Sequence, residues 1–500
     1  MLRNISTRVN NRGFLIVFGV IFLILTSYFY NRHALNIHFV DEEENIVLGS
    51  YILKGEKLYS DLFSQHQPLA YISSALIQKL THPGSIFTLI SRHRQAMILW
   101  SFIWGMFLTL GYGSAGLSFV ILYELSKIYI FGDLFLAESL SVYPLAYLSF
   151  VFFYNKSINP KTLFLTSLVL GMLLSNLLFI WPLSLFLYVG IVFKIPQGVV
   201  KRNLKYIVAG VLPYLLQLPF ISLSEYFFQV FYINVQYYIP TTGNFALFKS
   251  FFYPILLFDP RIAATQFLMI LRILSFILVV GSFLLIKLRK KIDFLIVYVL
   301  LVLAALRFVP FGGEYYRGFH LLPWYGLLIF SIIIVCTKLL NSYSSLLPLF
   351  AIFVALPLSS ATLTQNINKN ERYYINYSRQ FDYGEAVRIM RDNNDTLFVV
   401  PDEFLIYWQG DVEHAMDYLF YYDWMMKTPL IAEAVTAHIK ETPPTFFYCD
   451  CMGKSANELT TGYFRLKKDG YPTKLYVLPQ KVRRLNQVQL GQLKYYNFSF

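Results

Sequence analysis

The chain has 500 residues, of which 56% are hydrophobic and 18% aromatic, whereas only 14% are charged. Soluble domains are about one quarter charged, so this composition excludes an ordinary water-soluble globule, and the high apolar fraction excludes intrinsic disorder. The 42 Lys and Arg residues outnumber the 29 Asp and Glu residues and give a net charge of +13. These cations cluster in short segments between apolar runs, as in loops that fix membrane topology. We therefore expect a polytopic membrane protein with no nucleic-acid partner.

The apolar stretches predict about eleven transmembrane helices. The first runs from Gly13 to Tyr30 after a basic segment and offers no good cleavage site, which predicts an uncleaved anchor and a cytoplasmic N-terminal tail at 1–12. The other spans are expected at 95–112, 114–131, 137–154, 162–178, 180–194, 206–222, 265–286, 293–309, 321–337 and 346–362. Alternation of these spans puts the main Lys and Arg clusters on one side, in agreement with the positive-inside rule. The pattern predicts a multi-pass protein of the cell (plasma or inner) membrane.

The same alternation divides the chain into a membrane core and outer segments. Residues 13–364 are expected to form the transmembrane core, with 31–94 as its first extracytoplasmic loop. After residue 365 charged residues mix with short apolar runs. These runs predict strands at 396–401 and 445–449 and helices at 384–391 and 429–440. Residues 365–500 are therefore expected to form a small extracytoplasmic α/β domain.

The first outer loop opens with four consecutive acids, Asp41-Glu42-Glu43-Glu44. Residues 46–54 then predict a helix on the membrane surface, and Pro68 suits the first turn of a second helix that begins at Leu69. Two hairpinned helices would bring the acids back against the membrane. A carboxylate at that boundary can take a proton from an incoming hydroxyl, which is general-base chemistry. The alternative is a run of acids that merely solvates the loop.

Further ionisable residues are expected on the same outer side. Asp133 and Glu138 flank the turn between the third and fourth spans, a depth that is costly for carboxylates unless they are paired, functional or snorkelling. Arg94 opens the second span, and Arg317 and His320 lie close to the tenth. Outward-facing arginines need anionic partners, such as a lipid phosphate, a pyrophosphate or a nearby carboxylate.

Several familiar motifs are absent or misplaced. Gly111-Tyr-Gly113-Ser-Ala-Gly116 matches a dinucleotide fingerprint, but it joins two membrane spans and has no strand before it, so we expect a tight turn or close helix packing there. The sequence contains no Walker loop, Gly-x-Ser-x-Gly elbow or His-Glu-x-x-His helix. Its three cysteines cannot form a four-ligand zinc site or a disulfide framework.

Taken together, these features resemble the C-type (GT-C) glycosyltransferases, which include protein mannosyltransferases and the aminoarabinose transferase of lipid A. The resemblance depends on an Asp-Glu pair soon after the first span and on the run Gly55–Phe63, Gly-x-x-Leu-Tyr-x-Asp-x-Phe, before Pro68-Leu-x-Tyr71. An arginine at the second span and the late segment Arg317–Pro323 complete it. The resemblance implies an inverting transfer of a sugar from a polyprenyl-phosphate carrier to an acceptor lipid, protein or polysaccharide on the extracytoplasmic face.

The resemblance also implies roles for individual residues. Asp41 with Glu42 would be the catalytic acid/base pair, and Asp133 or Glu138 would match a second acidic loop. The residues implied to bind the donor phosphate or lipid are His66, Arg94, Arg317 and His320. Several relatives have an acid where this chain has Gln65, so the resemblance implies no certain cofactor and leaves a divalent metal open. A histidine binds phosphate strongly only when it is protonated.

Two other function classes are compatible with a polytopic chain. A lipid or sugar transporter or flippase would have ionisable residues near the bilayer midplane and inverted repeats. A non-catalytic membrane scaffold would use the outer domain for binding alone. The ionisable residues of this sequence gather on one face of the predicted bundle, which favours surface chemistry over transport.

Overall fold

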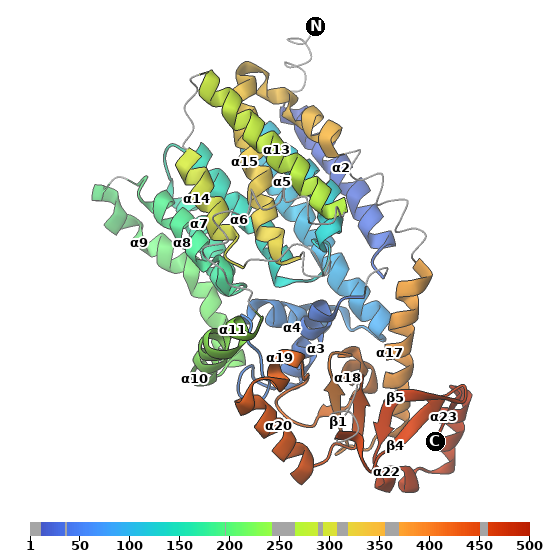
Figure 1. Ribbon diagram of the computed structural model, residues 1–500. Coiled ribbons are helices and arrows are strands. Elements are labelled where there is room, and N and C mark those ends of the chain that lie inside the picture. The colour runs from blue at the N-terminus through green and yellow to red at the C-terminus, as the bar shows by residue number, and fades with distance from the viewer. Residues whose placement is uncertain are drawn as a thin grey trace.

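The computed structural model describes residues 12–35, 38–195, 197–242, 266–288, 294–307, 319–355, 370–450 and 459–500. Several sequence predictions lie at least partly outside these ranges, among them most of the N-terminal tail 1–12, Arg317, and the end of the span expected at 346–362. Apolar helices form one end of the molecule, and a smaller α/β part, which contains the C-terminus, forms the other (Figure 1).

The apolar part of the described chain is a helical bundle. Its helices and 3-10 segments are α2 (Arg12–Arg32), α5 (Ile86–Ser126), η1 (Lys127–Ile130), α6 (Ala137–Tyr154), α7 (Pro160–Leu174), η2 (Leu178–Ile180), α8 (Trp181–Val192), α9 (Gln197–Val211), η3 (Leu212–Phe220), α13 (Gln266–Lys287), α14 (Phe294–Ala304), α15 (Leu322–Leu340) and η6 (Asn341–Leu346). Three helices of the described ranges are long and apolar enough to cross a membrane by themselves: Arg12–Arg32, Ile86–Ile130 and Phe319–Leu340. Shorter apolar helices cover Pro160–Leu174, Leu178–Val192, Phe294–Ala304 and Tyr343–Ala355. Each of the eleven predicted spans thus overlaps helical residues.

The glycine-rich segment in α5 is a turn between two antiparallel halves of that helix. Gly113 has non-helical backbone angles, with φ 59° and ψ −129°. A Cβ at Gly116 would lie 2.1 Å from the carbonyl oxygen of Leu108, so only glycine permits this close approach. Across the hairpin, the Lys127 ammonium donates a hydrogen bond of 2.8 Å to the Ser101 hydroxyl. The predicted tight turn is confirmed, and the dinucleotide motif has no structural basis.

Glu124 and Lys127 form an ion pair inside the bundle. Glu124 and Lys127 are 2% and 1% exposed and approach to 2.8 Å. The Tyr143 hydroxyl donates to Glu124 at 2.7 Å, and Lys127 also lies 4.5 Å from the centroid of the Tyr30 ring. Because each charge has a partner and further polar contacts, this pair acts as a cross-link between helices.

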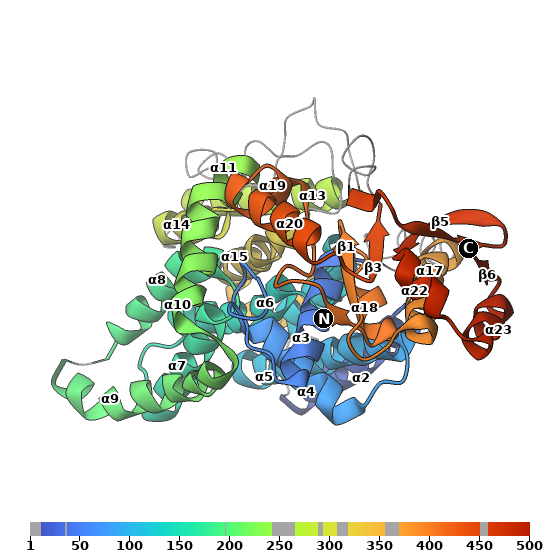
Figure 2. The same cartoon turned by 90° about the horizontal axis from the view of Figure 1, so that it is seen from below.

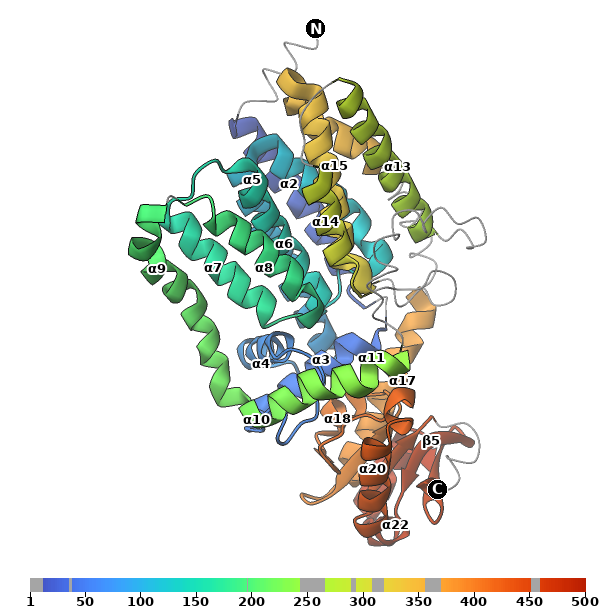
Figure 3. The same cartoon turned by 60° about the vertical axis from the view of Figure 1, so that its left-hand side comes forward.

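Two helices of the first outer loop, α3 (Val40–Lys54) and α4 (Leu69–Thr81), lie across the end of the bundle between it and the α/β part (Figures 1 and 3). Pro68 precedes α4 as predicted, and Gly55 ends α3 with φ 102°. The helix expected at 46–54 is present as part of α3, but the prediction that it lies on the membrane surface is wrong. Ile46, Tyr51 and most of α3 are buried, because α3 packs between α4 and the α/β part rather than on an open membrane surface.

A second group of helices extends along the same layer. These helices are α10 (Leu223–Tyr226), the π-helix η4 (Phe227–Tyr238) and α11 (Ile239–Thr242). Tyr226 and Tyr238 point inward, where their hydroxyls donate to or accept from polar side chains. Phe227 and Phe228 are 60% and 41% exposed. The aromatic residues of this segment therefore divide between the interior and an outward apolar surface.

The α/β part is built on a six-stranded mixed sheet in the order β2-β1-β3-β5-β4-β6. Its strands are β1 (Thr396–Val400), β2 (Glu413–His414), β3 (Phe446–Cys449), β4 (Phe464–Lys468), β5 (Tyr471–Val477) and β6 (Phe498–Ser499). Its helices are α17 (Asn370–Met390), α18 (Leu405–Gly410), α19 (Asp423–Met426), α20 (Pro429–Glu441), α22 (Pro479–Arg484) and α23 (Gln487–Tyr495). Strand β1 pairs in parallel with β2 and β3, and β3 pairs antiparallel to β5 with Phe446 opposite Val477. Figure 2 shows this part from below, with the sheet beside α18 and α20.

Polar contacts attach the α/β part to the outer loop and α5. The Tyr51 hydroxyl donates to the carbonyl of Val412 at 2.7 Å, and the amide of Phe63 donates to the carbonyl of Asp417 at 2.8 Å. The amide of Ile86, at the start of α5, donates to Gln409 Oε1 at 3.1 Å. These contacts hold the α/β part over α3, so that it covers the layer that carries the four acids.

Candidate active site

The four acids lie at the start of α3, with Asp41, Glu42 and Glu43 in its first turn, and their side chains leave the helix in different directions. Glu42, Glu43 and Glu44 are only 0%, 0% and 4% exposed, while Asp41 keeps part of its surface accessible. Consecutive residues of an α-helix are rotated by about 100° from one another, so four neighbours contact four different surroundings. The interpretation of the run as a solvated loop is therefore wrong, because burying carboxylates is costly unless each has a specific environment.

Asp41 faces a cavity between the outer loop and the bundle. In the described part of the chain its carboxylate accepts no hydrogen bond from protein. The pKa of Asp41 is raised to about 7, chiefly because burial disfavours the carboxylate and secondly because Glu138 lies nearby, while Arg307 acts in the opposite direction. A carboxylate of this kind can accept a proton near neutral pH.

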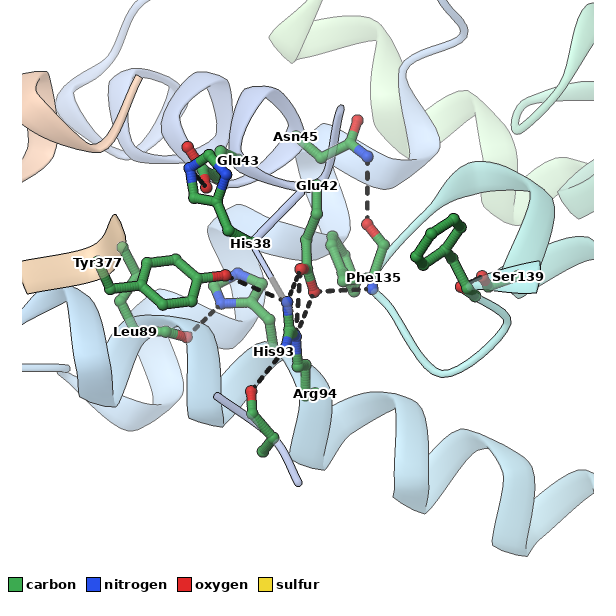
Figure 4. Close-up of polar contacts among 12 residues, drawn as sticks. His38, Glu42, Glu43, Asn45, Leu89, His93, Arg94, Phe135, Ser139 and Tyr377 are labelled. Carbon is green, nitrogen blue, oxygen red and sulfur yellow. Dashed lines mark hydrogen bonds and ion pairs between the residues drawn. The ribbon is translucent and has the colours of Figure 1, made fainter. Parts of the chain in front are cut away.

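Glu42 turns to the other side of α3 and pairs with Arg94 (Figure 4). The Arg94 Nε lies 3.1 Å from both carboxylate oxygens, and the amide of Phe135 donates to Glu42 Oε1 at 2.9 Å. Arg94 also donates to the carbonyl of Ala34 at 2.7 Å and to the Tyr377 hydroxyl at 3.2 Å. The structure thus does not bring Glu42 or Arg94 to the cavity of Asp41. Their geometry is that of a buried bidentate pair that fixes α3 against α5.

Glu43 and Glu44 have two further environments. Glu43 lies 2.9 Å from His38 Nε2 and accepts a hydrogen bond of 3.0 Å from Gln380 of α17. Glu44 accepts a hydrogen bond of 3.0 Å from the Tyr71 hydroxyl of α4. Burial, and then the nearby Asp41, raise the pKa of Glu44 to about 8, so this group is largely protonated at neutral pH.

The cavity brings together residues from seven separate segments of the described chain. Its lining residues are Asp41, Glu44, Asn45, Gln65, His66, Gln67, Ala70, Leu136, Ala137, Glu138, Asn176, Leu177, Leu178, Phe179, Asn234, Tyr238, Arg307, Phe319 and His320. Four of the sequence-predicted site residues meet here: Asp41, His66, Glu138 and His320. Asp41 and His320, which are 279 positions apart along the chain, therefore line the same cavity, as the sequence pattern alone could not demonstrate.

Glu138 organises the cations of the cavity. It lies in the first turn of α6, where the helix dipole favours a negative charge. Glu138 Oε1 is 3.2 Å from Arg307 Nη1 and 2.8 Å from His320 Nδ1. Arg307 is further held by a hydrogen bond of 3.0 Å to the Tyr238 hydroxyl and by the face of the Phe179 ring at 5.0 Å. Its Nε remains buried without a partner among the described residues, which leaves one guanidinium edge available to an anion.

His66 reaches the cavity from the segment before α4. Its backbone carbonyl accepts from the Tyr59 hydroxyl at 2.8 Å, and its amide donates to the Ser64 hydroxyl at 3.1 Å. Burial, followed by the charge of Arg307, lowers the pKa of His66 to about 4. The imidazole is therefore neutral near pH 7 and can contribute a hydrogen bond rather than a positive charge to a bound phosphate.

Asp133 lies apart from this cavity. Its pKa is raised to about 6 by burial, while the charges of Arg94 and Lys127 oppose that rise. Of the two acids expected in the second outer loop, the structure therefore places Glu138 at the cavity and Asp133 beside the Glu42–Arg94 pair. Arg317 lies outside the described residues. Within the described ranges, no group of three His, Cys, Asp or Glu side chains is placed to hold a metal ion.

Several members of the site are not among the sequence-predicted site residues. Arg307, which follows α14, is one of the outward-facing arginines for which the sequence predicts an anionic partner, but the sequence analysis assigns it no role in the site. The carboxamides of Gln67 and Asn176 carry no motif. Tyr422, from the α/β part, has a buried hydroxyl without a hydrogen-bond partner among the described residues and interacts electrostatically with Glu44 and Asp41. The α/β part thus contributes to the surroundings of Asp41, and no sequence motif indicates this contribution.

Comparisons with known proteins identify the fold. No protein-family model matches the chain, and no curated protein matches it in sequence. Among solved structures, the chain is similar to the crystal structure of ArnT from Cupriavidus metallidurans bound to undecaprenyl phosphate. The TM-score is 0.52 at 12% sequence identity, and the match covers 91% of this chain and 97% of that one. The predicted fold, a polytopic bundle of apolar helices with a small C-terminal α/β part, is confirmed, and it is the fold of that structure.

Proposed function

We propose that this protein is a membrane glycosyltransferase that moves a sugar from a polyprenyl-phosphate carrier to an acceptor on the extracytoplasmic face. The observation that carries the proposal is the cavity in which Asp41, without a protein hydrogen bond in the described ranges, lies near an arginine with a free guanidinium edge. The similar structure is bound to undecaprenyl phosphate, which supports a polyprenyl-phosphate donor. The acceptor is a lipid, a protein or a polysaccharide.

In the proposed reaction, an acceptor hydroxyl attacks the anomeric carbon from the face opposite to the phosphate. The new bond joins the acceptor oxygen to that carbon, the bond from the carbon to the phosphate oxygen breaks, and the hydroxyl proton passes to the Asp41 carboxylate. A single displacement of this kind inverts the anomeric configuration. Asp41 is thus the general base, and its raised pKa suits proton transfer near neutral pH.

Arg307 would stabilise the leaving group. The phosphodiester of the donor carries one negative charge, and the departing polyprenyl phosphate gains a second as the bond breaks. Preorganised donors directed at developing charge in a buried site are among the largest contributions to catalysis. Arg307 is held by Glu138, Tyr238 and Phe179, so its unpaired Nε needs no reorganisation to meet the phosphate. His66 and His320 would add hydrogen bonds, and we propose positioning roles for Glu42 and Arg94.

The proposed orientation places the cavity and the α/β part outside the cell, with the N-terminus in the cytoplasm. The positive-inside distribution of loop cations supports this arrangement. Cys449 of β3 is disulfide-bonded, and disulfides persist mainly in oxidising compartments outside the cytoplasm. Labelling of an engineered cysteine in the α/β part of intact cells by a membrane-impermeant thiol reagent would test the orientation directly.

The experiment that tests the proposed function is mass spectrometry of glycolipids and surface glycans. Cells would make the wild-type protein, Asp41→Asn, Asp61→Asn, or no protein. Asp61 is an exposed acid of the same outer loop and serves as the matched control. We expect one sugar adduct to be present with the wild type and Asp61→Asn and absent from the other two. Equal profiles for Asp41→Asn and the wild type would refute the assignment and favour a transporter or scaffold.

A further inference from the structure

The cavity is lined by an unusual number of side-chain amides. These amides belong to Asn45, Gln65, Gln67, Asn176 and Asn234. They come from α3, from the segment that precedes α4, from the end of α7 and from η4, so a common secondary-structure element does not explain their meeting. An amide offers both a hydrogen-bond donor and an acceptor, and it carries no charge.

Three of these amides carry a buried polar atom with no protein partner in the described ranges. These atoms are Gln65 Oε1, Gln67 Nε2 and Asn176 Oδ1, on residues that are 6%, 3% and 1% exposed. Buried polar atoms are almost always hydrogen-bonded, because burial without a partner costs free energy. Three such atoms on one cavity therefore indicate a ligand that supplies the missing partners.

The other ends of the amides are fixed. The Tyr226 hydroxyl donates to Gln67 Oε1 at 3.0 Å, and Asn176 Nδ2 donates to the Ser141 hydroxyl at 2.8 Å. The backbone carbonyl of Gln65 accepts a hydrogen bond of 2.7 Å from Asn234 Nδ2. These contacts orient Gln67 and Asn176 before any ligand arrives, so the unpaired atoms form a preorganised set of one donor and two acceptors.

Two of the three carboxyl groups that line the cavity in the described part of the chain have protein partners. Glu138 is paired with Arg307 and His320, and Glu44 accepts a hydrogen bond from Tyr71. Asp41 is the remaining carboxylate of the described lining, and the proposed reaction uses it as the base. A cationic amino sugar that paired its ammonium group with Asp41 would therefore occupy the base that the reaction needs, whereas the hydroxyls of a neutral sugar match amide donors and acceptors.

We infer that the transferred group is a neutral, polyhydroxylated sugar, whose hydroxyls bind Gln65, Gln67 and Asn176. This inference depends on the proposed function, since it concerns the sugar of the same donor. The amides discriminate against amino sugars, because an ammonium group would replace an acceptor hydroxyl beside Gln67 Nε2 and leave that donor unpaired. They supply the specificity of the site, while Asp41 and Arg307 supply its chemistry.

The test uses the purified full-length protein in lipid nanodiscs and three probes. The probes are undecaprenyl phosphate, the same lipid phosphate carrying a neutral hexose, and the same lipid phosphate carrying a 4-amino-4-deoxypentose. We expect the wild type to bind the hexosyl probe at least tenfold more tightly than the aminopentosyl probe. Gln67→Met and Asn176→Leu should each weaken hexosyl binding about tenfold and leave the affinity for undecaprenyl phosphate unchanged, which also shows that the variants are folded.

Two results would overturn the inference. The first is equal or tighter binding of the aminopentosyl probe by the wild type. The second is unchanged affinity for the hexosyl probe in both variants, which would mean that the amides do not contact the sugar. If the wild type binds none of the three probes, the proposed function itself fails, and the inference fails with it. The near-isosteric variant Gln67→Glu provides a further check. Because a carboxylate at this position can pair with an ammonium group, the ratio of the affinities for the hexosyl and aminopentosyl probes should be smaller in this variant than in the wild type.

Discussion

The Glu42–Arg94 pair provides a quantitative prediction, because its position separates a structural role from the phosphate-binding role that the sequence suggested for Arg94. Replacement Arg94→Met removes the guanidinium and leaves Glu42, which is 0% exposed, with the amide of Phe135 as its remaining hydrogen-bond donor. Breaking a buried ion pair on one side costs about 3–5 kcal/mol. The entropy of unfolding is about 2.1 cal/mol/K per residue, which is about 1 kcal/mol/K for 500 residues that unfold cooperatively. A loss of about 4 kcal/mol would therefore lower Tm by about 4 °C.

The assay is thermal unfolding of the detergent-solubilised protein, with two companion variants. Arg92→Met removes an exposed arginine of the same helix and should leave Tm unchanged. Glu42→Gln with Arg94→Met leaves no unpaired charge, so the double variant should be more stable than Arg94→Met alone. The reasoning would be refuted if Arg94→Met unfolded at the wild-type temperature yet bound undecaprenyl phosphate at least tenfold more weakly. Arg94 would then be a phosphate ligand.

Three further predictions concern the cavity. Since the pKa of Asp41 is raised to about 7 and the base must be ionised, kcat/KM should rise about tenfold per pH unit below pH 7 and level off above it; a flat profile between pH 5.5 and 8 would exclude Asp41 as the base. Arg307→Gln should lower kcat by about 10²–10³-fold because it removes a charge from the leaving phosphate, and a rate within threefold of the wild type in a single-turnover assay would contradict that role. Tyr422→Phe removes one buried hydroxyl near Asp41 and should shift the acidic limb of the pH profile without loss of Tm, whereas an unmoved limb would show that the α/β part does not influence the base.

Much of the architecture was predictable from the sequence because hydrophobic length alone identifies membrane helices. The apolar stretches located eleven helical segments, and the glycines at 111–116 located the hairpin inside α5. Asp41 and His66 were identified on their positions beside the first span and before Pro68. These signals are local, and they remain valid whatever the tertiary arrangement.

The remaining features depend on tertiary contacts that no local pattern contains. The sequence shows Glu42 beside Asp41, but helical rotation turns one toward Arg94 and the other into the cavity. Arg307 could not be distinguished from neighbouring arginines, since only the tertiary structure brings this residue, which follows α14, to Glu138 of α6. The ligand-binding role inferred for Asn176 depends on its buried, unpaired Oδ1, which only the folded structure reveals.

The most direct test of the central claim is the rate of sugar transfer by purified Asp41→Asn at pH 8. The folded-state pKa of Asp41 lies above its ordinary value, so its ionised form favours the unfolded chain, and the stability that protonation provides is lost as the pH rises through about 7. Asp41→Asn should therefore be at least as stable as the wild type at pH 8, and a loss of activity cannot be ascribed to unfolding.

Donor binding and transfer would be measured side by side for Asp41→Asn, Asp61→Asn and the wild type. The account predicts that all three bind the polyprenyl-phosphate sugar within about threefold of one another, and that Asp41→Asn alone loses transfer by at least about 10²-fold, the usual lower bound for a general base. The wild-type product should have the inverted anomeric configuration. Transfer by Asp41→Asn at the wild-type rate would contradict the account.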